Sequence, residues 1–199
     1  RKTGPRLKIC DMGCGSGIIG YVLSGLYEVV LQDTVDQRAD QAKGMPFYRT
    51  LPKEYAAYFD IVLLNHVLPH TDAPSGLLDE VARVLAPGGG VYLALPNRWF
   101  PVEPIYRIPL IHWLPVKWFN RIARFFFGKK YEPVCHFSPK QVARFVVRHG
   151  FFGENVTRVV LKEPDLQRLL GLNHWMGWLA ARVAFLMPTQ IWVLRKVRI

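Results

Sequence analysis

The stretch from Asp11 to Gly20, DMGCGSGIIG, constrains the fold more than any other part of this chain. The apolar run 7–10 before it predicts a strand, and the residues from about 16 to 25 predict a helix. Glycines in such a turn adopt positive φ and let a ligand approach the backbone closely. The turn ends where the first N–H groups of a helix lack partners within the helix. A strand, a bare turn and a helix in this order indicate the ligand-binding edge of an α/β fold.

The rest of the chain continues this alternation of strands and helices. Further strands are predicted at 27–33, 46–52, 59–67, 90–97, 154–164 and 189–197, and further helices at 36–42, 74–89, 138–150 and 165–188. Alternation of this kind is typical of a parallel sheet with helices on both faces. The prediction is a Rossmann-like, seven-stranded α/β sheet with insertions after the fifth and sixth strands. A length of 199 residues suits a single domain, 1–199.

Charge is distributed unevenly along the chain. The net charge is +11, and residues 98–148 alone hold 10 basic and 2 acidic side chains, whereas residues 1–97 hold 9 basic and 10 acidic ones. The second half is therefore expected to face something anionic. The three cysteines fit no disulfide framework, so we expect reduced thiols and a cytoplasmic location. Polar residues interrupt the apolar stretch 169–194, which argues against a membrane-spanning helix.

The glycine turn taken alone is ambiguous. Gly15 to Gly20 satisfies the G-x-G-x-x-G pattern of dinucleotide enzymes, and Asp33 or Asp36 follows at about the required distance. A carboxylate at Asp11, just before the turn, would however repel a pyrophosphate. S-adenosylmethionine carries a sulfonium, an ammonium group and no phosphate, so it would tolerate that carboxylate.

Several segments, in order from residue 7 to 160, resemble class I S-adenosylmethionine-dependent methyltransferases. The turn DMGCGSG matches the first motif of that family, and Asp33 matches the acid that binds the ribose hydroxyls. The segment NHVLPH (65–70), the run LLDEVARVLAPGGGVYLALPN and the run HFSPKQVARFVVRHGF are similar to later segments of the same family. The resemblance implies an S-adenosylmethionine cofactor, and it implies these cofactor-binding residues: Asp11, Gly13, Cys14, Gly15, Gly17, Asp33, Asn65 and His66.

The stretch FYRTLPKEY, after the third predicted strand, departs from the family pattern. Relatives usually carry an acid there that holds the adenine amino group, and no clear match is present. This departure keeps one alternative open, a cofactor-binding relative that has lost catalysis and serves as a partner subunit.

Histidines are the candidate catalytic residues. A hydroxyl acceptor needs a base near neutral pH, which histidine provides. His70 is the favoured base, and His66 and His136 are further candidates. His66 and His70 are four residues apart, but Pro69 argues against a regular helix and no third ligand is apparent, so no metal is predicted.

Residues 98–137 form a basic, aromatic insertion that should act as a lid and set substrate choice. Glu103, His112 and Trp113 are its candidate substrate-binding residues. Three interpretations stay open for this insertion: a lid helix packed on the core, a helix at a membrane surface, and a nucleic-acid interface. The apolar insertion 165–188 favours the second of these, peripheral membrane contact with a lipid-linked substrate.

The expected function is methyl transfer from S-adenosylmethionine to oxygen of a hydrophobic, lipid-linked or saccharide small molecule at a membrane surface. A tRNA or RNA methyltransferase is the alternative that shares the fold, and nucleic acid is the less favoured partner.

Overall fold

The computed structural model describes residues 6–102, 137–169 and 173–197, together with Leu110, Trp113, Trp118, Arg121, Arg124, Phe125 and Gly171. Most of the predicted insertion 98–137 therefore lies outside the described residues. So do three candidate site residues, Glu103, His112 and His136.

The core of the fold is a seven-stranded sheet in the order β3-β2-β1-β4-β5-β7-β6. The strands are β1 (Lys8–Met12), β2 (Glu28–Gln32), β3 (Phe47–Tyr48), β4 (Phe59–Asn65), β5 (Leu85–Pro96), β6 (Phe151–Asn155) and β7 (Thr189–Lys196). The pairs β1–β2, β1–β4, β2–β3 and β4–β5 are all parallel. The prediction of a seven-stranded Rossmann-like sheet is confirmed.

The chain divides into two compact units. The first takes its residues from Arg1–Ala94, Ala143–Glu154 and Trp192–Ile199, and the second from Leu95–Val142 and Asn155–Ile191. The division does not test the prediction of a single domain, which stays a prediction.

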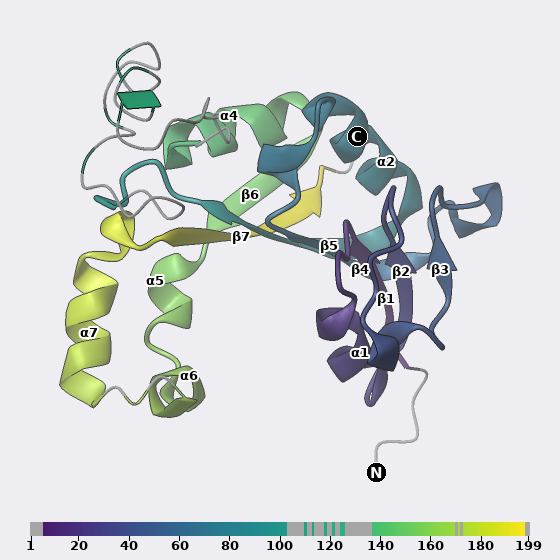
Figure 1. Cartoon of the computed structure of the whole chain (residues 1–199), viewed down its shortest axis with the longest axis horizontal. Helices are drawn as coiled ribbons and strands as arrows, with labels where there is room; N and C mark the ends of the chain where they lie inside the picture. Colours follow the sequence, from purple (N-terminus) through teal and green to yellow (C-terminus); the bar gives the residue numbers. More distant parts are fainter. Residues whose placement is uncertain are drawn as a thin grey trace. The chain divides into compact units, whose positions relative to one another are not determined.

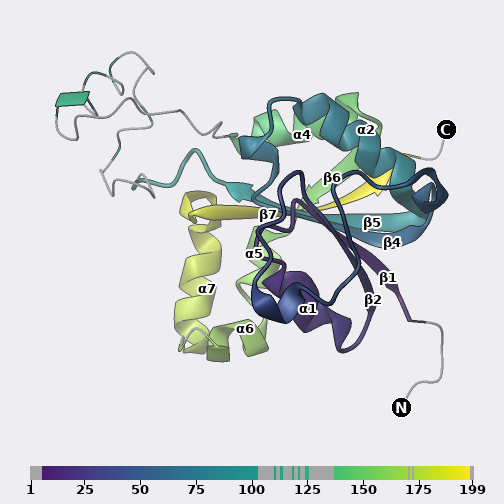
Figure 2. The ribbon, with the colours of Figure 1, turned by 45° about the vertical axis from the view of Figure 1, so that its right-hand side comes forward.

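In the first unit, helices cover both faces of the strands. Helix α1 (Ile18–Ser24) lies on one face of β1 and β2, and helix α2 (Pro74–Val84) lies on the other face of the sheet (Figures 1 and 2). The strands carry alternating or continuous apolar runs, whose side chains are buried between these layers. Phe59, Leu64, Leu78 and Leu93 are fully buried at its centre.

Among its described residues, the second unit is largely helical, and two buried amide side chains join its segments by hydrogen bonds. It contains α5 (Thr157–Val160), α6 (Pro164–Leu169), α7 (His174–Arg182) and the 3₁₀ turn η5 (Ala184–Leu186). Asn97 donates from Nδ2 to the carbonyl oxygens of Phe185 (2.7 Å) and Met187 (2.9 Å). Gln190 donates from Nε2 to the carbonyl oxygen of Phe137 (2.6 Å). The segment 165–188, which is predicted to be helical, contains two short helices and a 3₁₀ turn in place of one long helix.

Helix α4 (Pro139–Arg148) begins as the sequence predicts. Ser138 precedes it and forms a reciprocal cap with Gln141: the Ser138 N–H donates to Gln141 Oε1 (2.9 Å), and the Gln141 N–H donates to Ser138 Oγ (3.4 Å). Pro139 occupies the first helical position, where its missing N–H costs nothing.

The predicted strand 154–164 is wrong. The strand is β6, which ends at Asn155, and the chain then enters α5. Asn155 Oδ1 accepts from the Thr157 N–H (3.1 Å), and Thr157 Oγ1 accepts from the Ile191 N–H (2.8 Å). These side-chain contacts start a helix where the β-branched run favours a strand, because tertiary partners outweigh weak local propensity.

The predicted helix 36–42 is also wrong, since only the 3₁₀ turn η1 (Asp40–Ala42) forms there. The guanidinium of Arg38 pairs with both oxygens of Asp36 and donates from Nη1 to the carbonyl oxygens of Ala42 and Met45. Arg38 thus binds carbonyl oxygens in and after η1, and the Ala42 carbonyl oxygen also accepts from the Met45 N–H (3.1 Å). The helix predicted at 74–89 ends earlier, at Val84, because Leu85 already pairs with Phe59 of β4.

The close contact between Gly13 and Val67 provides a test of the packing in the first unit. Its φ is +71°, and a Cβ there would lie 2.5 and 2.6 Å from the two γ-carbons of Val67. Gly13→Ala should lower the free energy of unfolding by about 2–4 kcal/mol, from left-handed backbone strain and overpacking together. Urea unfolding measures this. Gly44→Ala is the control, because a Cβ at Gly44 meets nothing within 4 Å. Equal stabilities for the two variants would contradict the packing described here.

Candidate functional site

The sheet changes direction between β1 and β4. From β1 the chain proceeds outward through β2 to β3, and it then returns to the other side of β1 with β4 and β5. The carboxyl ends of β1 and β4 therefore diverge into loops that leave a crevice between them. In open parallel sheets, ligands bind outside the carboxyl ends of the strands at this point.

A cavity of about 480 Å³ lies at these carboxyl ends. This volume falls within the range of small-molecule sites. The residues that line the cavity come from the turn after β1, the end of β2, the loop after β4 and the start of α2: Gly13, Gln32, Asp33, Thr34, His66, Val67, His70, Thr71, Asp72 and Leu77.

The glycine turn directs its N–H groups to acceptors of the protein itself. The N–H groups of Gly13 and Cys14 both donate to the carbonyl oxygen of Gln32, at 2.7 and 3.0 Å. The Gly15 N–H donates to Asp33 Oδ2 (2.8 Å), and the Gly17 N–H donates to the carbonyl oxygen of Cys14 (2.8 Å). A phosphate-binding turn instead presents such donors to the ligand. The turn is thus poorly suited to a pyrophosphate.

Asp11 caps the helix that follows the turn. Its side chain is buried, and Oδ2 accepts from the N–H of Gly20 (3.1 Å), the third residue of α1. Burial, and to a lesser extent the charge of Asp33, raises the pKa of Asp11 to about 6. The sequence predicts that this carboxylate faces the ligand. The structure turns it toward α1, where it occupies the amino end that an anion would otherwise bind.

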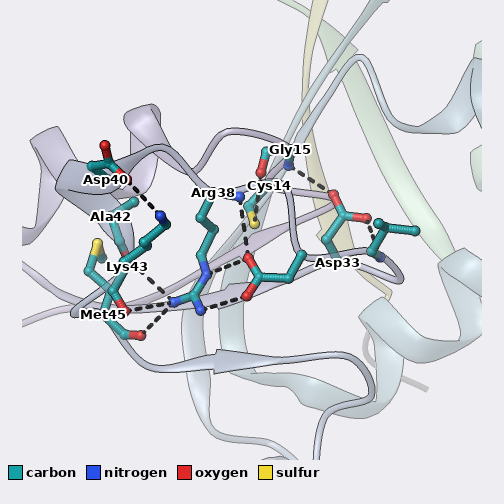
Figure 3. Close-up of polar contacts among 10 residues, drawn as sticks. Cys14, Gly15, Asp33, Arg38, Asp40, Ala42, Lys43 and Met45 are labelled. Atoms are coloured by element: carbon teal, nitrogen blue, oxygen red, sulfur yellow. Dashed lines mark hydrogen bonds and ion pairs between the residues drawn. The ribbon is translucent and has the colours of Figure 1, made fainter.

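Asp33 is one of two acids that line the cavity, the other being Asp72. Figure 3 shows its carboxylate beside the Gly15 N–H. Oδ1 accepts only long hydrogen bonds of 3.4 Å, from Thr34 Oγ1 and the Val35 N–H. Asp33 thus holds the glycine turn with one oxygen and presents acceptor capacity to the cavity with the other.

The second acid of the dinucleotide pattern, Asp36, is engaged elsewhere. Arg38 donates to it from Nε to Oδ1 (2.8 Å) and from Nη2 to Oδ2 (2.9 Å). This hydrogen-bonded pairing lowers the pKa of Asp36 to about 2. Of the two acids that the spacing allowed, Asp33 alone lines the cavity.

His66 and His70 both line the cavity, from the loop after β4. His66 has a left-handed backbone, with φ of +60°, and its N–H donates to the carbonyl oxygen of Ala94 (2.8 Å). Non-glycine residues seldom adopt this conformation outside functional or tightly constrained positions. Burial, and then the charge of His70, lowers the pKa of His66, so its imidazole is neutral near pH 7. His70 ends the 3₁₀ turn η3 (Leu68–His70) and is exposed.

A second cavity of about 390 Å³ shares Gln32 and Leu77 with the first. Its walls also include Met12, Leu51 and Arg49. Its one acid, Glu80, is bound by Arg83 through two hydrogen bonds of 2.6 and 2.7 Å. This cavity therefore offers apolar walls and backbone groups but no unpaired carboxylate, which agrees with the missing acid in FYRTLPKEY.

The second unit contains a cavity of its own, of about 360 Å³, lined by Arg98, Trp99, Trp113, Ser138 and Gln141. The rings of Trp99 and Trp113 meet edge to face, with centroids 6.4 Å apart. Trp113 Nε1 donates to the carbonyl oxygen of Arg98 (3.0 Å). Two aromatic walls and a cation suit a ring-shaped ligand with a polar or anionic substituent.

The predicted site residues thus fall into two groups. Gly13, Asp33, His66 and His70 line the first cavity, and Trp113 lines the cavity of the second unit. Asp11, Cys14, Gly15, Gly17 and Asn65 do not line the first cavity; Cys14 packs against the apolar cluster around Leu31, and Asn65 ends β4 beside Ala94. Their predicted roles in cofactor binding, like all the residue assignments, stay predictions.

Other cavity residues escaped the sequence analysis. Thr71 and Asp72 directly follow the segment NHVLPH, so extending that loop by two residues would have included them. Nothing in the sequence marks Leu77 as a cavity residue, because an apolar side chain at this position of α2 is typical of ordinary core packing. Within the part of the chain that the structure describes, no three His, Cys, Asp or Glu side chains gather as a metal site requires.

Comparison with known proteins identifies the family. Residues 2–154 match the family described as "Methyltransferase domain", which is more than half of the chain. The chain belongs to this methyltransferase family. The resemblance to class I S-adenosylmethionine-dependent methyltransferases is confirmed, and S-adenosylmethionine is the cofactor of that family.

Curated methyltransferases and solved structures agree with this assignment. The ubiquinone biosynthesis O-methyltransferase of Thiobacillus denitrificans is 27% identical over 104 residues, which is 46% of this chain and 45% of that protein. The enzyme of the same name from Parvibaculum lavamentivorans is 27% identical over 124 residues, 55% of this chain and 49% of that protein. The chain thus matches about half the length of these relatives.

An S-adenosylmethionine-dependent methyltransferase from Mesorhizobium loti has a solved structure with the same fold. The TM-score is 0.60 at 17% identity, and the match covers 96% of this chain and 92% of that one. At this identity the likeness concerns the fold alone.

The first cavity fits the family's cofactor in the hydrogen-bond acceptors that it offers. The carboxylate of Asp33 suits ribose hydroxyls or a cation, and Asp72 adds a second acid to the lining. The glycine turn and the capped amino end of α1 leave little to attract a phosphate.

The raised pKa of Asp11 yields a pH prediction. Between pH 4 and pH 6 the folded methyltransferase binds the Asp11 proton more tightly than the unfolded chain does, so this group's stabilisation falls as the pH rises through that window. Asp11→Asn removes the titration. The stability of the wild type relative to this variant should therefore fall by about 2 kcal/mol between pH 4 and pH 7. Urea unfolding at both pH values measures the difference, and a pH-independent difference would refute the buried cap.

Proposed function

We propose that this chain transfers a methyl group from S-adenosylmethionine to an oxygen of a hydrophobic, lipid-linked or saccharide small molecule at a membrane surface. The observation that carries the proposal is the cavity at the switch point, where Asp33, His66 and His70 line one space. The names of the curated relatives, O-methyltransferases of ubiquinone biosynthesis, support oxygen as the acceptor atom and an apolar acceptor.

Asp33 and the residues around it would hold the cofactor. The carboxylate accepts hydrogen bonds from hydroxyl groups, and Gly13, which has no side chain, lines the same cavity. The second cavity, with Met12 and Leu51 in its walls, would accept the base through apolar contact. S-adenosylmethionine, when bound, supplies a methyl group on a positively charged sulfur, which leaves as a neutral thioether.

His70 would take the proton of the acceptor hydroxyl. A hydroxyl attacks a methyl group poorly until a base removes its proton, and an imidazole does this near neutral pH. His66 lies in the same cavity and is held neutral by burial, so it is the second candidate. His136 stays a prediction outside the described residues.

The cavity of the second unit would hold part of the acceptor. Trp99 and Trp113 provide two aromatic walls, and Arg98 provides a positive charge for an anionic substituent. Trp99 is positioned by its N–H, which donates to Oδ1 of the buried Asn97 (3.1 Å).

Asp33→Ala tests the cofactor site. The variant loses a charged acceptor, so the dissociation constant for S-adenosylhomocysteine should rise roughly 10- to 100-fold. Isothermal titration calorimetry measures it, with circular dichroism to check the fold. Asp40→Ala is the matched control, because Asp40 is an exposed acid that pairs with the exposed Lys43. Equal affinities for the Asp33 variant and the control would remove Asp33 from the site.

His70→Ala tests the base. Transfer of a labelled methyl group to a panel of phenols and lipid-linked sugars should slow on the order of 100-fold, while the affinity for S-adenosylhomocysteine stays unchanged. The matched control is His149→Ala, since His149 lies at the end of α4 with its ring nitrogen on the Phe145 carbonyl oxygen. Full turnover in the His70 variant would exclude it as the base.

A further inference from the structure

Helix α7 and the turn η5 expose their largest apolar side chains. Trp175 is 64% exposed, Trp178 47%, Leu179 50% and Phe185 59%. Trp175, Trp178 and Leu179 are spaced three and four residues apart, so they lie on one face of α7. We call Trp175, Trp178, Leu179 and Arg182 the outer face of α7. Soluble helices usually present such side chains to the core.

The opposite face of α7 is made of small residues and fixes the orientation of the helix. Ala181 is buried, and Gly177 packs so closely on α6 that a Cβ there would lie 2.9 Å from Gln167 Cγ and closer still to its amide group. Gln167 is itself buried, and its Nε2 donates to the Leu161 carbonyl oxygen (3.0 Å). Helix α7 also lies beside α5 (Figure 1). With its small face fixed against α5 and α6, α7 cannot rotate to bury its tryptophans.

Charge on the outer face is positive only. Arg182 is the one charged residue between 173 and 188, and its guanidinium lies 3.8 Å from the centre of the Trp178 ring. The whole chain carries a net charge of +11. A second copy of such a chain would be repelled, whereas an anionic surface would be attracted. Tryptophan and arginine together suit the headgroup region of a bilayer, where rings meet the apolar boundary and cations meet lipid phosphates.

We propose that the outer face of α7 binds the surface of an anionic lipid bilayer and so brings the enzyme to a membrane-borne acceptor. The inference rests on the proposed function, which it deepens by naming the surface and its partner. Among the described residues no helix is long and apolar enough to cross a bilayer, and the proposal requires contact with one leaflet only. Trp175 and Trp178 would lie at headgroup depth, and Arg182 would contact the phosphates.

Vesicle cosedimentation of the full chain tests the proposal. The probes are vesicles of phosphatidylcholine alone and vesicles with about one third phosphatidylglycerol. The wild type should bind the anionic vesicles, more weakly as salt increases. The double variant Trp175→Ser/Trp178→Ser should bind them roughly tenfold more weakly. Arg182→Gln should reduce the preference for anionic over neutral vesicles about fivefold.

The matched control is Val22→Ser/Leu26→Ser, which removes two exposed apolar side chains (68% and 71%) from α1 and its end. This control should bind vesicles as the wild type does. The proposal is overturned if the wild type ignores anionic vesicles, or if the tryptophan variant and the control bind alike. It is also overturned if light scattering shows a wild-type dimer that the tryptophan variant abolishes, because a second copy would then cover the face.

A parallel titration with S-adenosylhomocysteine separates this proposal from the proposed function. Retained cofactor affinity with no vesicle binding would refute the membrane surface alone. Vesicle binding by a protein that does not bind the cofactor would refute the methyltransferase proposal and leave the surface in place.

Discussion

The hydrogen bond from the Gly20 N–H to the buried carboxylate of Asp11 is the interaction on which the site depends. It joins the end of β1 to the first turn of α1 and supplies an internal negative charge to the amino end of that helix. The glycine turn between them then folds back on β2, with two N–H groups on the Gln32 carbonyl oxygen and one on Asp33. The carboxylate of Asp33 consequently lines the cavity, and the carboxylate of Asp11 lies at the helix end where a phosphate would otherwise bind.

This arrangement explains how one glycine pattern serves two ligand classes. In dinucleotide enzymes the turn and the helix end are donors to a pyrophosphate. In this chain Asp11, Gln32 and Asp33 accept hydrogen bonds from four N–H groups of these elements, those of Gly20, Gly13, Cys14 and Gly15. We therefore expect the cavity to favour hydroxyl groups and cations over a pyrophosphate. The outer face of α7 and the tryptophan-lined cavity belong to the second unit, and we propose them as the places for the membrane and the acceptor.

Local patterns in the sequence predicted most of the sheet and the acid that lines the cavity. Strands such as 59–67 and caps such as Ser138 can be predicted from runs of neighbouring residues, and Asp33 follows β2 directly. The failures concern partners far apart in the chain. The helix at Thr157 depends on a bond to Ile191, and the turn at 40–42 depends on the side chain of Arg38. The cavity of the second unit joins Trp99, Trp113 and Gln141, which no local pattern connects. The sequence indicates that Asp11 disfavours a pyrophosphate ligand, but only the fold shows that its carboxylate faces α1.

The central claim is that the switch-point cavity accepts a nucleoside with a sulfur-borne cation and rejects a pyrophosphate. The most direct measurement is a calorimetric titration of the wild-type chain with S-adenosylmethionine, S-adenosylhomocysteine and NAD under one set of conditions. We expect micromolar binding of the two sulfur compounds, with no heat from NAD even at millimolar concentration. Tight binding of NAD, with the sulfur compounds ignored, would contradict it.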